Sequence, residues 1–473
     1  KYHNINTRTK NFVTLFTKNG ETLYGEGVDR TNIILKLSYN GKSVFLTGAT
    51  GFVGKVMLEK LLYSCPGLEA VYILIREKQD QNANQRIKKV FSEQLFSRLR
   101  EHNPSALDKI VPIVGDISEP NLGLKPSDEQ LLIDKVSIVF HVAATIKFNE
   151  PLETVMNVNV AGTARVLSLS RRLRNPQAFV YMSTAYSYTD KYIVNEIIYP
   201  APASLKEVKK LIEIGINDDQ IKELLKGRPN TYTFTKALAE NLVADNHGDI
   251  PAVIVRPAIV SPSESEPLVG WVDNWFGGTA LMTSIAKGLI RVVLGQPHYN
   301  IDFIPVDYVS NLTIVSAAKC RSSDEVQVYN CCTSGENPLT LGKLTHLVLN
   351  YTRLNKFNDL PMPTLMFTKY RWLLILITLL LQTIPAYICD VIFMLMGKNS
   401  RFVKMLSKAV FVRDTLEYFT SRTWDIRAPK ARELYASLSA ADKEQFTFDP
   451  CSIDWDLYIP KYCSGIKNFL LKS

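Results

Sequence analysis

The sequence predicts an α/β protein, with a doubly wound parallel sheet followed by a smaller, mainly helical C-terminal domain. Strand-like and helix-like segments alternate from Gly41 onward, which is typical of a parallel sheet with helices on both faces. The chain has 473 residues and is 46% hydrophobic, so it is longer than one hydrophobic core usually supports. The proline-containing segment DLPMP, at 359–363, is a candidate linker between the two domains.

The order of apolar and amphipathic segments predicts each element of the sheet domain. A charged helical stretch at 203–226 interrupts the alternation of strands and helices and indicates an insertion. We therefore predict an N-terminal extension at 1–40, a sheet domain at 41–355 with an insertion at 200–228, and a helical domain at 364–473. The predicted strands cover residues 43–46, 71–75, 110–114, 137–142, 178–182 and 253–255, and the predicted helices cover 55–63, 83–99 and 155–172.

Charge and cysteine content narrow the class of protein. The formal net charge of +9 favours anionic partners, although solubility alone also explains it. Without a dense Lys/Arg block, no nucleic-acid-binding arm is predicted. The seven cysteines form no C-x-x-C pair, which argues against a zinc site and a secreted disulfide framework. No metal site is predicted, and a reducing compartment is favoured.

A glycine-rich segment, TGATGFVG at Thr47–Gly54, lies between a predicted strand and a predicted helix. In this context Gly48 permits a tight turn, Gly51 lets the backbone approach a pyrophosphate, and Gly54 lets the helix pack on the strand. The helix N-terminus then offers free N–H groups to the phosphates. The segment predicts a Rossmann-type dinucleotide site that includes Thr47, Gly48, Thr50, Gly51, Phe52, Val53 and Gly54.

The ends of the following strands extend this predicted cofactor site. Arg76 and Lys78 follow the next strand, where an NAD-specific protein usually carries an acidic residue, so the 2′-phosphate of NADP(H) is favoured over NAD(H). Glu77 lies between the two cations and leaves ribose binding open as an alternative. Asp116 and Ile117 follow the third strand, and Ala143 and Ala144 follow the fourth. The small side chains of the two alanines would let the cofactor lie against the end of the fourth strand.

Tyr232 and Lys236 form a Y-x-x-x-K pair that shares one face of a helix. The lysine ammonium can lower the pKa of the tyrosine and hold the nicotinamide ribose, so both Tyr232 and Lys236 are also predicted to bind the cofactor. The tyrosine then serves as a general acid toward a carbonyl that receives hydride. The strand at 178–182 ends at Ser183 and Thr184, at the sheet edge where ligands of such folds bind. Thr184, with Ser183 as second choice, is predicted to hydrogen-bond the substrate oxygen. The alternative is that both hydroxyls cap a loop.

These motifs together resemble the extended short-chain dehydrogenase/reductases. More closely, the chain resembles the fatty acyl-CoA reductases, which include the plant male-sterility proteins. The RPAIV motif at 256–260 places Pro257 and Ile259 at the cofactor by this resemblance. Besides the motifs above, the carrying segments are ILIR at 73–76, GDI at 115–117, STAY at 183–186, EPLVGWVDN at 266–274, IPVDYVSN at 304–311, FTFD at 446–449 and IDWDLY at 453–458.

The resemblance implies an NADPH-dependent oxidoreductase that reduces a long-chain fatty acyl-CoA to a primary fatty alcohol by two hydride transfers, releasing CoA. It also implies association with the endoplasmic reticulum or peroxisome membrane, with the active site facing the cytosol. A reductase that stops at the aldehyde and a non-catalytic NADP-binding membrane scaffold remain alternatives. The lysines of the insertion could meet CoA phosphates, or they could simply be solvated.

The segment 372–396 begins with the almost wholly apolar run WLLILITLLL. It reaches the roughly 20 residues needed to cross a bilayer only by including Pro385 and Asp390. A membrane span, a membrane-surface hairpin and simple packing in the second core all fit this pattern.

Overall fold

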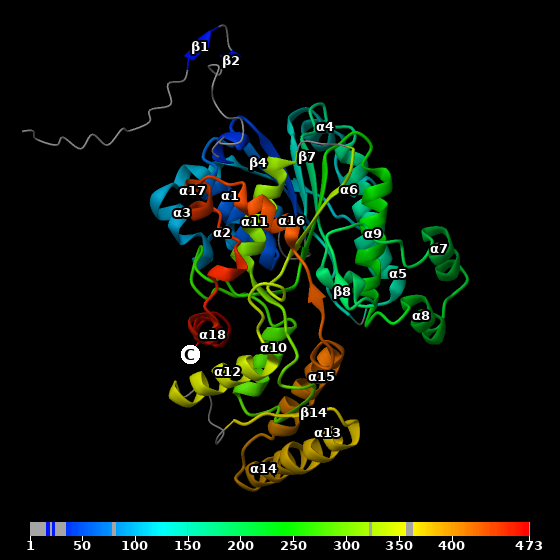
Figure 1. The fold of residues 1–473 in the computed structure, drawn as a ribbon, viewed down its shortest axis with the longest axis vertical. Coiled ribbons are helices and arrows are strands. Elements are labelled where there is room, and N and C mark those ends of the chain that lie inside the picture. The colour runs from blue at the N-terminus through cyan, green and yellow to red at the C-terminus, as the bar shows by residue number, and fades with distance from the viewer. Residues whose placement is uncertain are drawn as a thin grey trace, which may run out of the picture.

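The computed structural model describes residues 16–18, 21–23, 35–77, 82–148, 150–320, 324–355 and 363–472. Its centre is a seven-stranded, all-parallel sheet in the order β13-β9-β7-β6-β3-β4-β5 (Figure 1). The chain winds outward from β3 in one direction and from β6 in the other, so the doubly wound parallel sheet is confirmed. The strands are β3 (Ser43–Thr47), β4 (Ala70–Ile75), β5 (Ile110–Val114), β6 (Ile138–His141), β7 (Ala178–Met182), β9 (Ala252–Pro257) and β13 (Gln327–Cys331).

Helices cover both faces of the sheet because its strands are apolar on both sides. One face carries α1 (Phe52–Ser64), α2 (Ala83–Phe91), α3 (Ser97–His102) and α11 (Val306–Lys319). The other carries α4 (Pro126–Lys135), α5 (Leu152–Val155), α6 (Gly162–Ser170) and α9 (Thr231–Asn246). A π-helical turn, η6 (Met156–Ala161), joins α5 to α6. The predicted insertion forms two short helices, α7 (Leu205–Glu213) and α8 (Asp218–Leu225).

The single helix predicted at 83–99 is wrong, because the chain breaks into α2, a 3₁₀ turn η3 (Gln94–Phe96) and α3. The break turns Glu93 toward α1, where its carboxylate lies 2.7 Å from the Lys55 ammonium. Leu95 and Phe96 are buried beside it. A contact between distant parts of the chain therefore overrides the local helical periodicity.

The C-terminal region is mainly helical, as predicted. Two of its helices lie beside the sheet, whereas its first three gather at one end of the molecule (Figure 1). Helices α10 (Gly278–Ala286) and α12 (Leu341–Leu354) lie there too, although they precede the predicted boundary. The helices after residue 363 are α13 (Arg371–Thr378), α14 (Ile384–Leu395), α15 (Phe402–Thr420), α16 (Pro429–Ala436), α17 (Ala440–Gln445) and α18 (Trp455–Gly465).

Two strands from this region pair with strands that precede it. β14 (Met366–Thr368) pairs in parallel with β11 (Val292–Leu294), and β15 (Asp425–Ile426) pairs with β8 (Ile193–Val194). The predicted linker falls largely outside the described residues, and the division into domains at 41–355 and 364–473 stays a prediction. Two further short pairs are β10 (Ile259–Ser261) with β12 (Phe303–Pro305), and β1 (Phe16–Lys18) with β2 (Glu21–Leu23).

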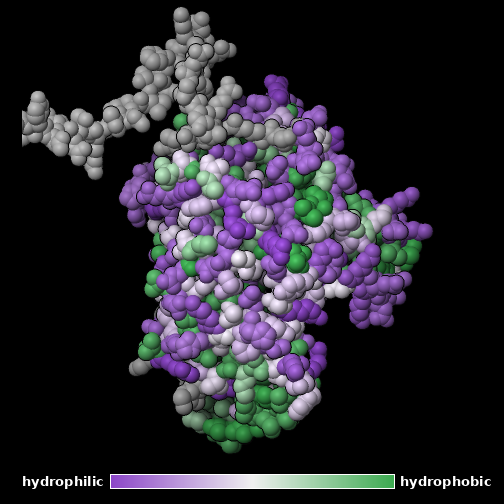
Figure 2. All heavy atoms as spheres, viewed as in Figure 1, coloured by the Kyte–Doolittle hydropathy of each residue, from purple (hydrophilic) through white to green (hydrophobic). Residues whose placement is uncertain are grey.

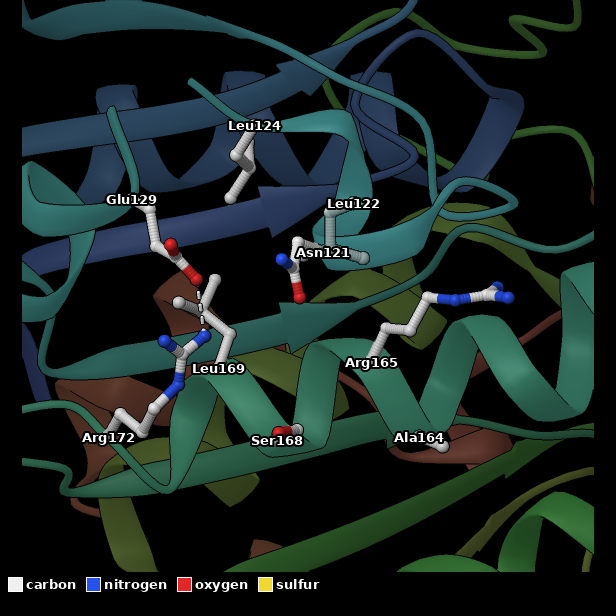
Figure 3. A pocket seen from close by; sticks show the side chains of 9 residues that line it. All are labelled: Asn121, Leu122, Leu124, Glu129, Ala164, Arg165, Ser168, Leu169 and Arg172. Atoms are coloured by element: carbon white, nitrogen blue, oxygen red, sulfur yellow. Dashed lines mark hydrogen bonds and ion pairs between the residues drawn. The ribbon is translucent and has the colours of Figure 1, made fainter. Parts of the chain in front are cut away.

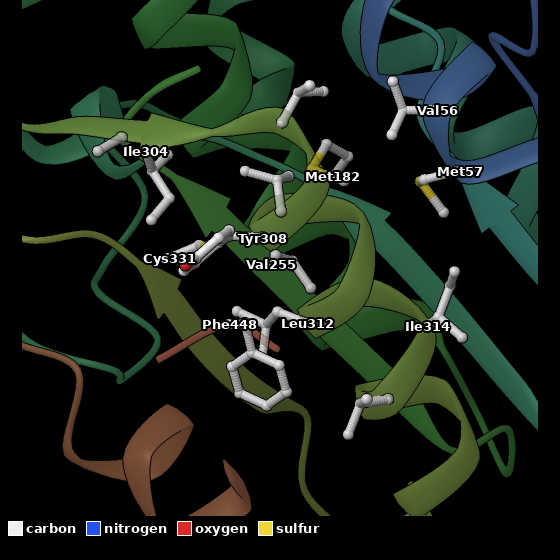
Figure 4. Packing of buried hydrophobic residues seen from close by; sticks show 14 of the residues in the cluster. Val56, Met57, Met182, Val255, Ile304, Tyr308, Leu312, Ile314, Cys331 and Phe448 are labelled. Atoms are coloured by element: carbon white, nitrogen blue, oxygen red, sulfur yellow. The ribbon is translucent and has the colours of Figure 1, made fainter. Parts of the chain in front are cut away.

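The C-terminal region also contributes to the main core. Phe448 packs near Leu312 of α11, which lies against Val255 and Met182 of the sheet (Figure 4). All four side chains belong to one cluster of apolar residues in contact. This packing ties the segment that precedes α18 to the sheet.

Candidate active site

The glycine-rich turn between β3 and α1 is a backbone cradle. Gly48 has a φ of +77°, and a β-carbon there would lie 2.7 Å from the Ala143 backbone nitrogen. A β-carbon on Gly54 would overlap the Gly48 carbonyl oxygen. Helix α1 begins at Phe52 without a side-chain cap, so the N–H groups of its first turn are available to a phosphate. The turn therefore fits the pyrophosphate of a dinucleotide.

The other residues predicted in this turn are placed as follows. Gly51 is exposed, and Thr50, Phe52 and Val53 are half-buried. The Phe52 ring stacks on Trp271, with ring centroids 5.4 Å apart. Thr47, by contrast, is fully buried, so its side chain faces the protein interior.

The Thr47 hydroxyl joins β3 to β6 across the site. It lies 2.8 Å from the His141 Nδ1 atom and accepts a hydrogen bond from the Ala143 N–H at 3.2 Å. His141 Nε2 lies 3.0 Å from the Thr163 hydroxyl. Burial lowers the pKa of His141 to about 3, so its ring is neutral. These contacts fix the ends of the two strands at the point where the sheet changes winding direction.

Basic side chains gather where the adenosine end of a dinucleotide would bind. Arg76 follows β4 and is exposed, with its guanidinium 3.6 Å from the Asp116 carboxylate at the end of β5. Arg86 of α2 donates a hydrogen bond to the Arg76 carbonyl oxygen, and burial and the Arg76 charge lower its pKa. The predicted Lys78 lies outside the described residues. Arg86 was missed, because its place in the sequence does not show that α2 packs against Arg76.

The remaining predicted cofactor residues divide into two groups. Ala143 and Ala144 are half-buried at the end of β6, beside the glycine turn. Ile117 is buried and packs against Gly162 of α6, so its side chain belongs to the core. Pro257 is buried at the end of β9, and Ile259 is half-buried in β10.

Tyr232 and Lys236 lie one turn apart near the start of α9, whose first turn is capped by the Asn230 side chain. The Lys236 ammonium donates to the Met182 carbonyl oxygen at 2.6 Å and lies 4.6 Å from the centre of the Tyr181 ring. α9 therefore carries the pair to the carboxyl end of β7. The half-buried Tyr232 ring lies 6.0 Å from the Phe148 ring.

The pKa values of this pair differ from the expectation that Lys236 lowers the pKa of Tyr232. Burial raises the pKa of the Tyr232 phenol well above its usual value. Burial also lowers the pKa of Lys236 to about 7, opposed by the nearby Glu240 charge. Desolvation is the main cause of both shifts. At neutral pH the phenol is protonated, which is the state that a proton donor needs.

The two predicted hydroxyls have different surroundings. Ser183 donates to the Glu240 carboxylate and is 3.3 Å from the Ser187 hydroxyl. Thr184 caps the 3₁₀ turn η7 (Ala185–Tyr188) by accepting from the Tyr186 N–H at 3.2 Å, and its hydroxyl lies 3.4 Å from the Pro257 carbonyl oxygen. A strong acceptor already holds Ser183, whereas Thr184 makes only long contacts.

Sequence reasoning missed a buried ion pair behind these residues. Glu240 and Arg256 are fully buried, with a nitrogen–oxygen distance of 2.6 Å. Glu240 also accepts from the Tyr188 hydroxyl at 2.8 Å, and Arg256 donates to the carbonyl oxygens of Asn195 and Ile197. The signal was the spacing of Tyr232, Lys236 and Glu240, each four residues apart on one helical face. The pair joins α9, β9 and the 188–197 segment.

Aromatic side chains from the C-terminal region complete the surroundings of Tyr232. The Phe419 ring of α15 lies 6.3 Å from Phe148 and 5.2 Å from Tyr186. Trp424 packs on Tyr186 at 5.6 Å. The motifs of the sheet domain could not predict these contacts, because Phe419 and Trp424 lie in the C-terminal region.

An apolar cavity lies between α10, α12 and β14. It is lined by side chains such as Leu281, Met282, Phe303, Leu344 and Phe367. Leu281 and Phe367 also belong to the apolar cluster on which Phe148 and Phe419 pack. Apolar side chains therefore continue from the Tyr232 neighbourhood to this cavity.

A separate cavity of about 220 Å³ lies between η5 (Pro120–Gly123), α4 and α6 (Figure 3). Its Arg172 and Glu129 side chains form an ion pair at 2.5 Å, and Arg165 donates to the Ile117 carbonyl oxygen. None of the predicted catalytic residues lines this cavity, so it is distinct from the candidate site.

Comparisons with known proteins agree with this geometry. An NAD-binding family model described as "Male sterility protein" matches residues 46–313, and a second model, "Sterile: Male sterility protein", matches 381–473. The chain is 35% identical to human "Fatty acyl-CoA reductase 1" over 439 residues, covering 92% of this chain and 85% of that protein. It is 32% identical to "Fatty acyl-CoA reductase 2" of Bos taurus over 445 residues, with the same coverage.

Among solved structures, the terminal R domain from the myxalamid PKS-NRPS pathway superposes with a TM-score of 0.62. The two chains are 20% identical, with 91% of this chain and 92% of that chain covered. At this identity the likeness supports the fold alone.

Proposed function

The chain belongs to the fatty acyl-CoA reductase family, and we propose that it reduces long-chain fatty acyl-CoA to the primary alcohol with NADPH. The observation that carries this proposal is the placement of Tyr232, Lys236 and Thr184 at the carboxyl ends of β7 and β9, beside a glycine cradle at the end of β3. Ligands of doubly wound sheets bind at this edge.

Each group at the edge has a role that follows from its contacts. A first bound NADPH would supply hydride to the thioester carbonyl, and the C–S bond would then break to release CoA and leave the aldehyde. A second NADPH, bound after the first has left as NADP⁺, would supply the hydride that reduces the aldehyde. Tyr232 donates a proton to the developing alkoxide, and Thr184 offers a hydroxyl to the same oxygen. Lys236, fixed by the Met182 carbonyl oxygen, would hold the nicotinamide ribose. Ser183 and Glu240 hold the strand end and are not assigned contact with substrate.

Product analysis tests the proposal directly. Purified protein, NADPH and a long-chain acyl-CoA should give the fatty alcohol as the end product by mass spectrometry. Accumulation of the aldehyde would instead favour a reductase that stops after one hydride transfer. No NADPH oxidation across a range of acyl lengths would favour a non-catalytic scaffold.

The preference for NADPH rests on the cations after β4. Arg76 and Arg86 lie next to one another, and a 2′-phosphate between them would relieve their repulsion. Replacing Arg76 by Ala should raise the KM for NADPH roughly tenfold to a hundredfold, because a hydrogen bond to a charged group contributes about 1.5–3 kcal/mol. The KM for NADH, which lacks that phosphate, should change little. An equal rise for both cofactors would contradict this role.

The apolar path beyond Tyr232 supports a long acyl chain as the substrate tail. We propose that the tail passes Phe148 and Phe419 and displaces the apolar side chains around Leu281, because the cavity there is about 30 Å³ and much smaller than an acyl chain. Leu281→Trp would fill the cavity and should lower the ratio of kcat/KM for long over short acyl-CoA at least about tenfold, since burying each methylene contributes about 0.8 kcal/mol. Leu354→Trp, at an exposed end of α12, is the matched control. An unchanged ratio for Leu281→Trp would place the tail elsewhere.

We also propose association with the membrane of the endoplasmic reticulum or peroxisome, with the active site facing the cytosol. A lipid substrate and a lipid product favour an enzyme at a membrane. The lysines of α7 and α8 are still predicted to contact the phosphates of CoA. Lys209 and Lys210 are exposed there, whereas Arg228 is already paired with Asp190 at 2.9 Å.

A further inference from the structure

Helices α13 and α14, joined by the π-helical turn η8 (Leu379–Thr383), expose an apolar face at one end of the molecule. Figure 2 shows this end as a continuous hydrophobic area, at the place where Figure 1 shows α13 and α14. Trp372 is 64% exposed, Leu380 50% and Ile388 54%. We call this surface the apolar end face; it also includes Ile375, Leu376, Leu379, Ile384, Tyr387, Val391, Ile392 and Leu395.

Three polar side chains in the middle of this helical segment point inward. Thr378 accepts a hydrogen bond from Arg413 of α15 at 2.7 Å, and Gln382 accepts from the Arg291 N–H at 3.2 Å. Asp390 is buried and accepts from three N–H groups at the start of α15, at 2.8–3.0 Å. A helix at a water-exposed surface has the opposite arrangement, with apolar side chains inward. This reversed amphipathicity indicates that the outward face of α13 and α14 contacts an apolar medium rather than water.

Cations flank the apolar end face. Residues 363–413 contain one carboxylate, the buried Asp390. The same segment contains seven basic residues, and all of them except Arg413 are exposed, including Lys369, Lys398, Lys404 and Lys408. Exposed Tyr370 and Trp372 stand at the N-terminal end of the helix, and such side chains prefer the headgroup level of a membrane. The positive charge around the apolar end face therefore complements the negative charge of anionic lipid headgroups.

We propose that the apolar end face docks on an anionic lipid membrane, with α13 and α14 lying in the plane of the membrane surface. This inference rests on the membrane association proposed above but not on the reaction. Within the described residues, Arg371–Leu395 is one helix long and apolar enough to cross a bilayer by length and composition. Its contacts at Thr378, Gln382 and Asp390, however, tie its whole length to the protein.

The orientation in the structure agrees with an in-plane helix. α13 and α14 follow one another across the lower end of the molecule (Figure 1). Spanning would require this segment to leave α15 and expose the Asp390 carboxylate to hydrocarbon, which is unfavourable. A second copy of the chain is a less favourable partner for the apolar end face than a membrane, because a two-fold contact through this face would bring the cations of both copies together.

Vesicle flotation of the purified full chain, without substrate, tests the proposal. The chain should float with vesicles of phosphatidylcholine and phosphatidylserine, and less with phosphatidylcholine alone. Leu380→Glu combined with Ile388→Glu should lower the bound fraction at least about tenfold on both vesicle types, since a charge in hydrocarbon is strongly disfavoured. Lys404→Glu combined with Lys408→Glu should lower it only on the anionic vesicles.

The control for the first pair is Ile214→Glu, at an isoleucine that is 67% exposed on the insertion. Thermal unfolding and NADPH binding show whether each variant is folded. Failure of wild type to float, or unchanged flotation of the folded Leu380→Glu/Ile388→Glu variant, would overturn the proposal. The proposal would also be overturned if wild type does not float but forms a dimer that dissociates in this variant, because the apolar end face would then bind a second copy of the chain. Flotation is measured without turnover, so its outcome does not depend on whether the protein reduces acyl-CoA. Failure of the docking proposal and failure of the proposed reaction are therefore distinguishable.

Discussion

Replacing Tyr232 by Phe should lower kcat for NADPH-dependent reduction of long-chain acyl-CoA at least about a hundredfold, the usual contribution of a positioned proton donor. The substitution removes only the hydroxyl and leaves the ring beside Phe148. The alkoxide that forms on hydride transfer would then lack its acid. Initial rates of NADPH oxidation measure the effect, and NADPH binding by fluorescence should be nearly unchanged.

The matched control is Tyr192→Phe, because Tyr192 is exposed and distant from α9 in sequence. It should retain wild-type kcat. A Tyr232→Phe variant that binds NADPH and keeps more than about a tenth of wild-type kcat would show that another group donates the proton. Thr184→Ala measured alongside shows how much the neighbouring hydroxyl contributes.

Replacing Arg256 by Met should destabilise the protein by about 3–5 kcal/mol, because it leaves the Glu240 carboxylate buried without its counter-charge. Both side chains are fully buried, and the guanidinium also lies 4.7 Å from the centre of the Tyr188 ring. Chemical denaturation followed by circular dichroism measures the change in the free energy of unfolding. A variant that also replaces Glu240 by Leu should recover part of the loss.

Arg427→Met serves as the control for this second prediction. Arg427 is half exposed and pairs with Asp425 at 2.9 Å, so its loss should cost less than about 1 kcal/mol. If Arg256→Met and Arg427→Met destabilise the protein equally, the buried pair does not hold α9 to β9 as inferred here.

The parts of the fold that sequence predicted well are those specified by neighbouring residues. The six predicted strands, β3, β4, β5, β6, β7 and β9, are short apolar runs bounded by polar residues, and the structure places each within two residues of its expected ends. The helix at 83–99 failed because Lys55, far away in the sequence, attracts Glu93. The two chains of hydrogen bonds that position Ser183 and Thr47 likewise depend on residues that only folding brings together.

The apolar segment shows the same limit. Composition left a span, a surface hairpin and a packed core open, because hydropathy does not say which way the few polar residues face. The inward positions of Thr378, Gln382 and Asp390 are visible only when α15 is in place. The cap that Asp390 provides to α15 explains a carboxylate that looked out of place in the sequence.

The late strands β14 and β15 have a consequence for how the chain is made. Each completes a parallel pair whose first strand, β11 or β8, is synthesised at least 70 residues earlier in the sequence. Until the ribosome releases the C-terminal region, β8 and β11 present unpaired edges, which favour aggregation. A truncated chain that ends before β14 would keep those edges permanently open, so expression of the nucleotide-binding part alone is a poor route to soluble material.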